Sequence, residues 1–279
     1  MERHPWNESF EWQDHAGPFR RLTDAEVAQF DEQGYVVVPD LVDADTLEAA
    51  TVDLDRFEAE VDAFLQTQED GRLSVAETGA LTVAPHGVTR SDALRRLSAH
   101  PAIADVCADL VGPDVRLYWD QAVYKKTEKP RRVPWHQDNG YVYVEPQAYL
   151  TVWLALTDAT ADNGCPWIAP GRHRLGTLLH HYVDPLGWEC LVEGEADDAV
   201  CAEVAAGGAV VFSSLTPHLT GPNLTEATRK AYILQYCPSG AAVLEGDPAA
   251  GAAERRVPCT HPKRQYEILR GGAHQVPGT

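Results

Sequence analysis

The fold of this chain is decided at Val133-Pro134-Trp135-His136-Gln137-Asp138-Asn139-Gly140-Tyr141, which carries an imidazole and a carboxylate two residues apart. On a β-strand the rise is about 3.3 Å per residue and alternate side chains share a face, so His136 and Asp138 would converge from backbones roughly 6 to 7 Å apart. One divalent metal ion would fit between them. The competing interpretation is a polar strand end with a surface His and Asp, which is favoured for any isolated HxD because the motif is so short. The rest of the chain has to decide between the two.

Composition places the chain among ordinary globular proteins. Its 279 residues are 44% hydrophobic and 23% charged, which is enough for a large core, and all-β domains commonly reach this length as a single unit. No apolar run approaches the roughly 20 residues that a membrane span requires, and the polar start, Met1 to Trp6, lacks the apolar segment of a signal peptide. We therefore expect a cytoplasmic enzyme or binding protein with no membrane contact.

Charge and cysteine content narrow the possible partners. The formal net charge of −19 argues against binding to nucleic acid, which needs a basic surface to displace counterions. Residues 24–70 hold 15 Asp and Glu against a single base, Arg56, and we interpret them as a solvated acidic helix face rather than a site for a cationic partner. The six cysteines form no CxxC pair, so we expect reduced thiols.

The N-terminal part of the sequence predicts helices around one strand. Thr23 and Glu26 have the spacing of a capping box, so a helix should begin at Thr23 and stop at Gly34. The remaining signals predict a loose or overlying arm at 1–22, a strand at 35–39, a long helix from 43–45 to Gly71, and two short helices within 91–111 that break at His100-Pro101.

After Gly112 the sequence changes to short β-rich runs separated by Gly, Pro and Asn, which is the pattern of a sandwich or barrel. The expected strands are 115–124, 149–156, 207–212 and 231–236. Past Gly240 the chain is rich in Ala, Gly and Pro, and we expect a poorly regular tail or lid over the mouth of the barrel. We interpret the chain as one domain with an arm at 1–22, helical support at 23–112, a β core at 113–238 and a tail at 239–279.

A metal site of two His and one carboxylate needs a second histidine from another strand. Such a site suits non-haem Fe(II), because it leaves positions open for oxygen and a co-substrate. Of the eleven histidines, His218 is the best placed, since it follows a predicted strand and directly precedes a turn at Gly221 to Asn223. Arg229 opens the next strand, so a hairpin would return it alongside His218. Its guanidinium could then hold a carboxylate through two hydrogen bonds.

Together, His136-x-Asp138, His218 and Arg229 resemble the phytanoyl-CoA dioxygenase family of Fe(II)- and 2-oxoglutarate-dependent oxygenases. The NG…PGSH segment of that family is similar to Asn163-Gly164-Cys165-Pro166-Trp167-Ile168-Ala169-Pro170-Gly171-Arg172-His173, with Arg172 where Ser is usual. Asn223, after the distal His, also fits. The resemblance covers roughly residues 23–238 and rests on the combination, because each motif alone is weak.

The resemblance implies a mostly β fold with peripheral α. This fold is a double-stranded β-helix, a cupin-like jelly-roll barrel with the N-terminal helices packed outside. It further implies that His136, Asp138 and His218 hold Fe(II).

The resemblance also implies where the co-substrates 2-oxoglutarate and O2 are used. Arg229 would bind the distal carboxylate of 2-oxoglutarate, with the Thr220 hydroxyl at the same end. Trp153 is placed where the family has a co-substrate contact, although it is about as easily a core residue. Gln121 would hydrogen-bond the co-substrate carboxylate near the metal.

Such an enzyme would hydroxylate an unactivated C–H bond of a small or mid-sized organic metabolite and release succinate and CO2. Asp138 favours hydroxylation over halogenation, because related halogenases have Ala or Gly in place of this carboxylate ligand. The same iron chemistry can give desaturation, cyclisation or epimerisation in a secondary-metabolite pathway, since the outcome depends on the substrate pose. Two alternatives stay open: a non-catalytic cupin-like binding module, and hydrolysis by Zn²⁺, in which Arg229 has no role.

Candidate substrate contacts are the aromatic and polar residues near these motifs: Trp135, Asn139, Tyr141, Tyr143 and Arg172. A basic cluster before the HxD would receive an anionic substrate, unless it is a solvated loop: Lys125, Lys126, Lys129, Arg131 and Arg132. The net charge of −19 would repel the phosphates of a CoA thioester, so we expect a free small molecule, such as a secondary metabolite or carboxylic acid. The sequence does not indicate the oligomeric state.

Overall fold

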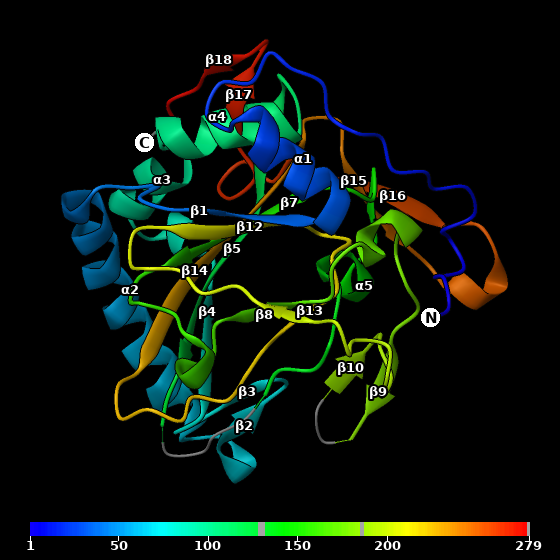
Figure 1. Ribbon diagram of the computed structural model, residues 1–279. Coiled ribbons are helices and arrows are strands. Elements are labelled where there is room, and N and C mark those ends of the chain that lie inside the picture. Colours follow the sequence, from blue (N-terminus) through cyan, green and yellow to red (C-terminus); the bar gives the residue numbers. More distant parts are fainter. Residues whose placement is uncertain (128–131, 185–186, 278–279) are drawn as a thin grey trace.

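A computed structural model of the chain describes residues 1–127, 132–184 and 187–277, and it is built on one large antiparallel sheet (Figure 1). The order of the main path of this sheet is β1-β12-β7-β14-β5-β4-β3-β2. In that order, the strands are Tyr35–Val38, Ala209–Ser213, Leu150–Ala155, Arg229–Pro238, Val115–Lys125, Leu81–Pro85, Ala76–Glu77 and Arg72–Leu73. Strand β17 (Glu267–Arg270) also pairs with β5, and β18 (Ala273–His274) pairs with β17.

Three small sheets complete the β structure. Their strands are β11 (Val200–Cys201), β8 (Pro166–Ile168) and β13 (His218–Thr220) in the first, β16 (Arg255–Pro258), β15 (Ala242–Glu245) and β6 (Val144–Glu145) in the second, and the hairpin of β9 (His181–Val183) and β10 (Gly187–Glu189) in the third. The first of them packs across the main sheet, because Ile168 of β8 shares an apolar cluster with Trp153 of β7 and Ile233 of β14.

Helices cover the other face of the main sheet. They are α1 (Asp24–Gln33), α2 (Ala44–Leu65), α3 (Asp92–Ser98) and α4 (Pro101–Leu110), while α5 (Asp138–Tyr141) is a single turn elsewhere. Short 3-10 turns lie at η1 (Glu69–Gly71), η2 (Gly87–Thr89), η3 (Ala161–Asn163), η4 (Arg172–Leu175) and η5 (Pro248–Ala250). No helix in the described part of the chain combines the length and apolarity needed to cross a membrane.

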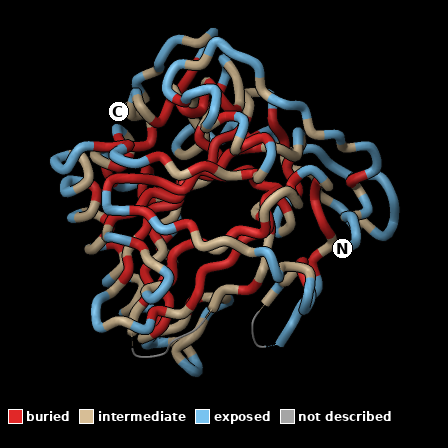
Figure 2. The backbone as a smooth tube through the Cα atoms, viewed as in Figure 1, coloured by how far each residue is buried: buried red, intermediate tan, exposed pale blue. Residues whose placement is uncertain are grey.

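Alternation along the central strands divides the core into two halves. In β7, Val152 and Leu154 join the cluster under the helices, whereas Trp153 and Ala155 face the small sheet of β8. The buried parts of the backbone accordingly concentrate in the sheets (Figure 2). The fold is the predicted jelly roll with helices outside. Among the described strands no ladder closes it into a full barrel, because the strands of the β11-β8-β13 sheet are only two or three residues long.

The N-terminal predictions hold except at the end of the long helix. Thr23 caps α1 with Glu26 in a capping box, and Gly34 ends it in the left-handed conformation with a φ of 86°. Helix α2, predicted to reach Gly71, stops at Leu65 instead. The chain then turns, and Gly71 ends the separate turn η1 before the β2–β3 hairpin.

The N-terminal arm takes the overlying one of its two predicted arrangements, whereas the C-terminal tail is more ordered than predicted. The arm lies over the body: Arg3 bridges to Leu178, and the Trp12 ring meets His173 edge-on with the ring centroids 4.4 Å apart. The tail forms strands rather than an irregular lid, because Leu269 in β17 is fully buried against the edge of β5. The Ala- and Gly-rich stretch at 246–254 is only the link between β15 and β16.

The acidic face of α2 is only partly solvated, which corrects the interpretation drawn from its charge. Glu58 accepts a hydrogen bond from the Thr82 hydroxyl at 2.8 Å and pairs with Lys126 at 2.8 Å. Asp55 likewise pairs with Lys230 at 2.8 Å. These acids therefore dock the helix onto bases at the neighbouring ends of the central strands β14 and β5.

Candidate metal centre and co-substrate site

The two histidines are joined through their backbones. The His136 amide donates to the His218 carbonyl at 2.9 Å, and the His218 amide donates back at 2.9 Å. This single bridge places the two imidazole rings with their centroids 4.2 Å apart. The convergence inferred from residues far apart in the sequence is therefore present in the fold.

Asp138 reaches the same point by a route that the sequence analysis predicted wrongly. The HxD does not lie along one strand, because Asp138 opens the helical turn α5. Gln137 enforces the turn: its buried amide donates to the Gly176 carbonyl at 3.0 Å and accepts from the Leu178 amide at 2.6 Å. With Gln137 held on the opposite side, the flanking imidazole and carboxylate face each other.

The three side chains are spaced to hold one ion. The Asp138 Oδ1 lies 4.0 Å from the His136 Nε2 and 3.9 Å from the His218 Nε2. All three atoms lie within 4.8 Å of one another. Two imidazoles and one carboxylate on one side of an ion form the facial arrangement that suits Fe(II) and leaves other positions open.

The histidines present the correct nitrogen to this point. The His136 Nδ1 lies 2.8 Å from the Pro134 carbonyl, and the His218 Nδ1 lies 2.9 Å from the Thr216 carbonyl. Each Nδ1–H can donate there, which leaves the Nε2 lone pair for a metal. Burial, with added repulsion from His218 and His180, holds the pKa of His136 well below its ordinary value, so this ring stays neutral.

Thr151 orients the carboxylate ligand and was missed from the sequence. Its hydroxyl donates to the Asp138 Oδ2 at 2.6 Å, so the other oxygen, Oδ1, is the one that faces the histidines. Thr151 lies in β7 two residues before Trp153, on the same face of the strand. That shared face was the available signal.

His180 packs against the turn α5 and was also missed from the sequence. Its Nε2 accepts from the backbone N–H of Gln137 at 3.0 Å, and burial lowers the pKa of His180 to about 4. Gly140 makes room for this ring, because a Cβ there would lie 1.8 Å from the His180 Cε1. A glycine in the metal motif is thus required by a close approach rather than by its φ angle.

Arg229 is a buried cation with unused donors. The residue is 1% exposed. Its Nη1 donates to the Val123 carbonyl at 3.2 Å, and its Nε and Nη2 have no partner among the described residues. It lies 4.9 Å from the centroid of the Trp153 ring. Burial lowers the pKa of Arg229 to about 10, so it stays charged near neutral pH. A buried charge of this kind calls for an anion.

The Thr220 hydroxyl contacts Lys125, the residue paired with Arg229 across the sheet. The Lys125 ammonium donates to the Thr220 hydroxyl and to the Thr220 carbonyl, both at 2.8 Å, and to the Gly221 carbonyl. Because the Thr220 oxygen already accepts, its own proton is free to donate. Lys125 lies opposite Arg229 in the pairing of β5 with β14. Gln121 lies on the same face of β5, where its Oε1 accepts from the Trp119 indole at 3.0 Å.

These residues fit the groups that the resemblance implies. The orphaned Nε and Nη2 of Arg229 match a carboxylate, and the donor set of His136, Asp138 and His218 matches Fe(II). The triad thus suits a metal ion, and the unpaired donors of Arg229 suit one carboxylate of a dicarboxylic acid.

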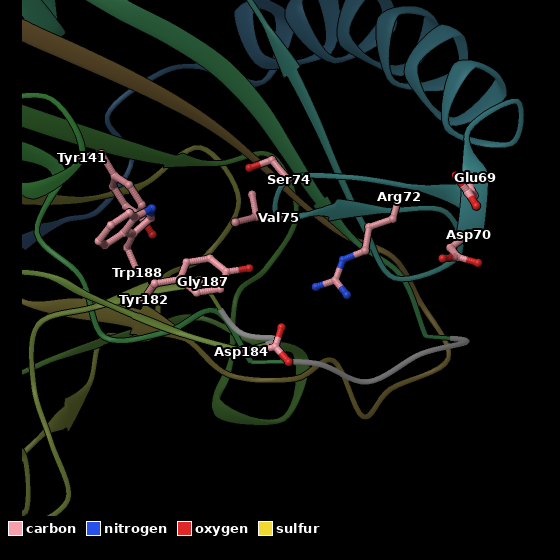
Figure 3. A pocket seen from close by; sticks show the side chains of 10 residues that line it. All are labelled: Glu69, Asp70, Arg72, Ser74, Val75, Tyr141, Tyr182, Asp184, Gly187 and Trp188. Carbon is pink, nitrogen blue, oxygen red and sulfur yellow. The ribbon is translucent and has the colours of Figure 1, made fainter.

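One cavity has a volume of about 560 Å³. The residues that line it are drawn in Figure 3. Tyr141 lines it and also places its ring centroid 5.2 Å from that of His136. In Figure 3, Tyr141, Tyr182 and Trp188 lie at one end, and Arg72, Asp70 and Glu69 lie at the other. Tyr141 therefore connects this cavity to the metal ligand His136.

Tyr141 lines this cavity, but other predicted substrate residues lie elsewhere. Trp135 packs into a satellite apolar cluster with Leu178 and Leu191. Asn139 is fully buried, and its amide bonds the Thr177 hydroxyl and the Val144 amide. Both were predicted from nearness in sequence, and packing gives them supporting roles instead.

Tyr143 and Arg172 are also engaged by other parts of the chain. The Tyr143 hydroxyl donates to the Trp6 carbonyl at 3.0 Å, beneath the N-terminal arm. Arg172 forms two hydrogen bonds of 2.5 Å to Asp198. Neither side chain reaches the cavity beside the metal centre.

The basic cluster does not exist as a binding surface in the described residues. Lys125 is buried, Lys126 pairs with Glu58, and Arg132 pairs with Glu189 at 2.7 Å. The other two members, Lys129 and Arg131, lie outside the described residues. Acids of the strongly negative chain therefore neutralise Lys126 and Arg132 locally.

Comparison with known proteins agrees with the geometry. The chain is 25% identical over 257 residues to phytanoyl-CoA dioxygenase domain-containing protein 1 of Danio rerio, covering 76% of this chain and 88% of the relative. It is 27% identical over 245 residues to methylphosphonate hydroxylase of Gimesia maris, covering 81% and 83%. Its fold is like that of the epimerase SnoN, solved with Fe3+, alpha ketoglutarate and nogalamycin RO, at a TM-score of 0.64 and 24% identity over 84% of this chain and 94% of that one.

The family model for phytanoyl-CoA dioxygenase (PhyH) matches residues 30–231, which include the three candidate ligands and Arg229. The metal-ligand geometry and the orphaned guanidinium lie within this matched region. The chain therefore belongs to the phytanoyl-CoA dioxygenase family, whose members are Fe(II)- and 2-oxoglutarate-dependent oxygenases acting on small molecules.

Proposed function

We propose that this oxygenase hydroxylates an unactivated C–H bond of a small or mid-sized organic metabolite, with release of succinate and CO2. The observation that carries the proposal is the buried Arg229 guanidinium. Its Nε and Nη2 lack partners among the described residues, and the same fold brings together the metal triad. A metal-binding protein without 2-oxoglutarate would have no use for such a cation.

Each residue of the site has a distinct task. His136, Asp138 and His218 would hold Fe(II), which with 2-oxoglutarate and O2 supplies the oxidising power to break the substrate C–H bond. Arg229 and the Thr220 hydroxyl would hold the distal carboxylate of 2-oxoglutarate and so fix its orientation.

Two further residues would complete the co-substrate site. Trp153 walls it beside Arg229, where the aromatic face also stabilises the guanidinium. Gln121 faces the same side of the sheet and would bond the carboxylate near the metal. Together these side chains exclude water from the co-substrate and set one binding pose.

The carboxylate ligand favours hydroxylation among the possible outcomes. Asp138 would occupy the coordination position that a halide needs, so halogenation is disfavoured. Epimerisation is the second candidate, because the epimerase SnoN shares the fold. Cyclisation and desaturation would use the same residues. Product analysis by mass spectrometry separates them, since hydroxylation adds one oxygen and epimerisation leaves the mass unchanged.

Alternatives of another class fit the site less well. A cupin-like binding module or a zinc hydrolase would use the triad but leaves the Arg229 cation unmatched. The predictions that the protein binds no nucleic acid and lies in the cytoplasm stay predictions.

The test is anaerobic addition of Fe(II) and then 2-oxoglutarate to the metal-free protein. We expect a weak visible metal-to-ligand charge-transfer band, together with succinate formation once O2 is admitted. His136→Ala should lose both signals, whereas Val276→Ala, at a side chain 91% exposed, should keep both. Absence of the band in the wild type, or its survival in His136→Ala, would rule out the proposed function.

A further inference from the structure

Three large aromatic side chains stand exposed in the cavity beside the metal centre. Tyr141 is 42% exposed, Tyr182 is 61% exposed and Trp188 is 48% exposed. Single exposed aromatics are ordinary, but several gathered in one concavity mark a binding surface. We call these three residues the aromatic wall (Figure 3).

The aromatic wall is a built surface rather than a loose loop. Tyr182 and Trp188 face each other across the β9–β10 hairpin as paired residues, with their ring centroids 5.8 Å apart in an edge-on arrangement. Such pairs stabilise a two-stranded hairpin. The two rings therefore present a fixed apolar surface to the cavity.

The hairpin is tied to the chain that carries the metal ligands. The Cys190 amide donates to the Trp135 carbonyl at 2.8 Å, and the Trp135 amide donates to Glu189 at 3.0 Å. Arg132 also pairs with Glu189 at 2.7 Å. These bonds anchor the hairpin that carries Tyr182 and Trp188 to Trp135, the residue before His136. The Tyr141 ring lies against the His136 imidazole, with the ring centroids 5.2 Å apart.

Charge at the rest of the cavity disfavours acidic ligands. The described lining residues include three carboxylates and one guanidinium: Glu69, Asp70 and Asp184 with Arg72. In Figure 3 the Arg72 side chain extends toward Asp184. The net negative lining adds to the −19 of the whole chain, so an anion would be repelled both on approach and when bound.

We propose that this cavity binds a ring-bearing substrate that is neutral or cationic, with its ring system packed against Tyr182 and Trp188 and its reacting carbon beyond Tyr141 at the metal. This inference rests on the proposed function and specifies its substrate class. It excludes CoA thioesters and replaces the carboxylic acid considered from the sequence. The aromatic wall selects the ring, and the acidic lining selects against negative charge.

Binding of matched probes tests the inference without knowledge of the natural substrate. The probes are 1-naphthalenemethanol, 1-naphthylmethylamine and 1-naphthaleneacetate, which share a ring and differ in charge, with hexylamine as the ringless control. Dissociation constants are measured by ligand-observed NMR. We expect the alcohol and the amine to bind at least about tenfold more tightly than the acetate and than hexylamine.

Variants of the aromatic wall locate the binding. Trp188→Ala and Tyr182→Ala should each weaken the amine about fivefold, whereas Tyr182→Phe, which keeps the ring, should bind like the wild type. Val276→Ala controls for a change at an exposed position elsewhere. Thermal unfolding shows whether each variant is folded. Both aromatic side chains are substantially exposed, so we expect both alanine variants to fold, and one folded variant is enough for the test.

Each result decides the matter. Equal binding of the acetate and the amine overturns the charge selection, and unchanged binding in a folded Trp188→Ala or Tyr182→Ala variant overturns the role of the aromatic wall. Failure of every ring probe to bind the wild type overturns the inference altogether. Succinate formation by the wild type is measured separately, so failure of the oxygenase activity is distinguished from failure of the substrate class.

Discussion

The Thr151 hydroxyl donates to the Asp138 Oδ2 across 2.6 Å, and this bond decides which carboxylate oxygen faces the metal position. The other oxygen, Oδ1, lies within 4.0 Å of both histidine Nε2 atoms. A neighbour that does not touch the metal therefore sets the geometry of the ligand that does.

Replacement of Thr151 by Val should weaken Fe(II) binding by about 10- to 100-fold, because the carboxylate loses its orienting donor. Thr151→Ser keeps the hydroxyl and should bind Fe(II) nearly as the wild type does. Titration of the charge-transfer band with Fe(II) under saturating 2-oxoglutarate measures both. Equal affinities of the Val and Ser variants would show that the bond does not position Asp138.

Replacement of Arg229 by Gln should raise the KM for 2-oxoglutarate by about 100-fold or more, because a charge-assisted, two-point contact with the distal carboxylate is lost. Arg229→Lys should recover part of the effect through its point charge. The discriminating measurement uses 2-oxobutyrate, which lacks the distal carboxylate. Its weak turnover should not fall further in Arg229→Gln, and a parallel fall for both acids would contradict the assigned role.

Replacement of Lys125 by Met should lower the free energy of unfolding by about 2 kcal/mol, because two buried carbonyls at Thr220 and Gly221 lose their donor. Lys126→Met is the matched control on the adjacent residue. Lys126 and its partners, Glu58 and Asp62, keep part of their side chains in water, so a loss below about 1 kcal/mol is expected. Urea unfolding compares the two, and equal losses would remove the distinction between them.

Asp120 should give the protein a pH-dependent stability. Burial raises the pKa of Asp120 from 3.8 to about 6, against hydrogen bonds from Tyr232 and the Val88 amide that lower it. The folded state then holds the Asp120 proton more tightly than the unfolded state does. Protonation of Asp120 therefore stabilises the fold below about pH 4, and this stabilisation is lost as the pH rises to about 6. The loss amounts to about 3 kcal/mol.

Asp120→Asn isolates this contribution, since the amide keeps an oxygen acceptor and cannot ionise. His86 lies 3.9 Å from Asp120, and its own pKa is lowered to about 4 by burial and by the charge of Arg264, so the wild-type profile alone would mix two titrations. The difference in unfolding free energy, variant minus wild type, should rise between pH 4 and pH 6. A difference that is flat over this range would contradict the raised pKa.

Local signals predicted local structure well. The capping box at Thr23 and the left-handed stop at Gly34 depend only on neighbouring residues, and both are present in α1. The metal triad was also within reach, because His136, Asp138 and His218 are chemically distinctive. For Thr151 the sequence offered only the strand face that it shares with Trp153, because its contact with Asp138 arises once β7 is placed between β12 and β14.

Sequence nearness was misleading where the chain turns sharply. Asn139 and Trp135 flank the metal ligands, yet α5 turns Asn139 inward to bond Thr177, and Trp135 packs into a satellite apolar cluster. Charge was misleading for a related reason. Lys126 and Arg132 appeared as a basic run, but in a chain of net charge −19 each has an acid from a distant element within reach. Such pairings depend on tertiary structure and leave no local signal.

The reciprocal backbone bond between His136 and His218 has a consequence for how such enzymes diversify. Two metal ligands that are hydrogen-bonded through their own peptide groups keep their separation whatever the length of the chain between them. Residues 137–217 include the β9–β10 hairpin with Tyr182 and Trp188. Insertions or deletions in that hairpin can therefore change which molecule is recognised while the iron chemistry is inherited intact.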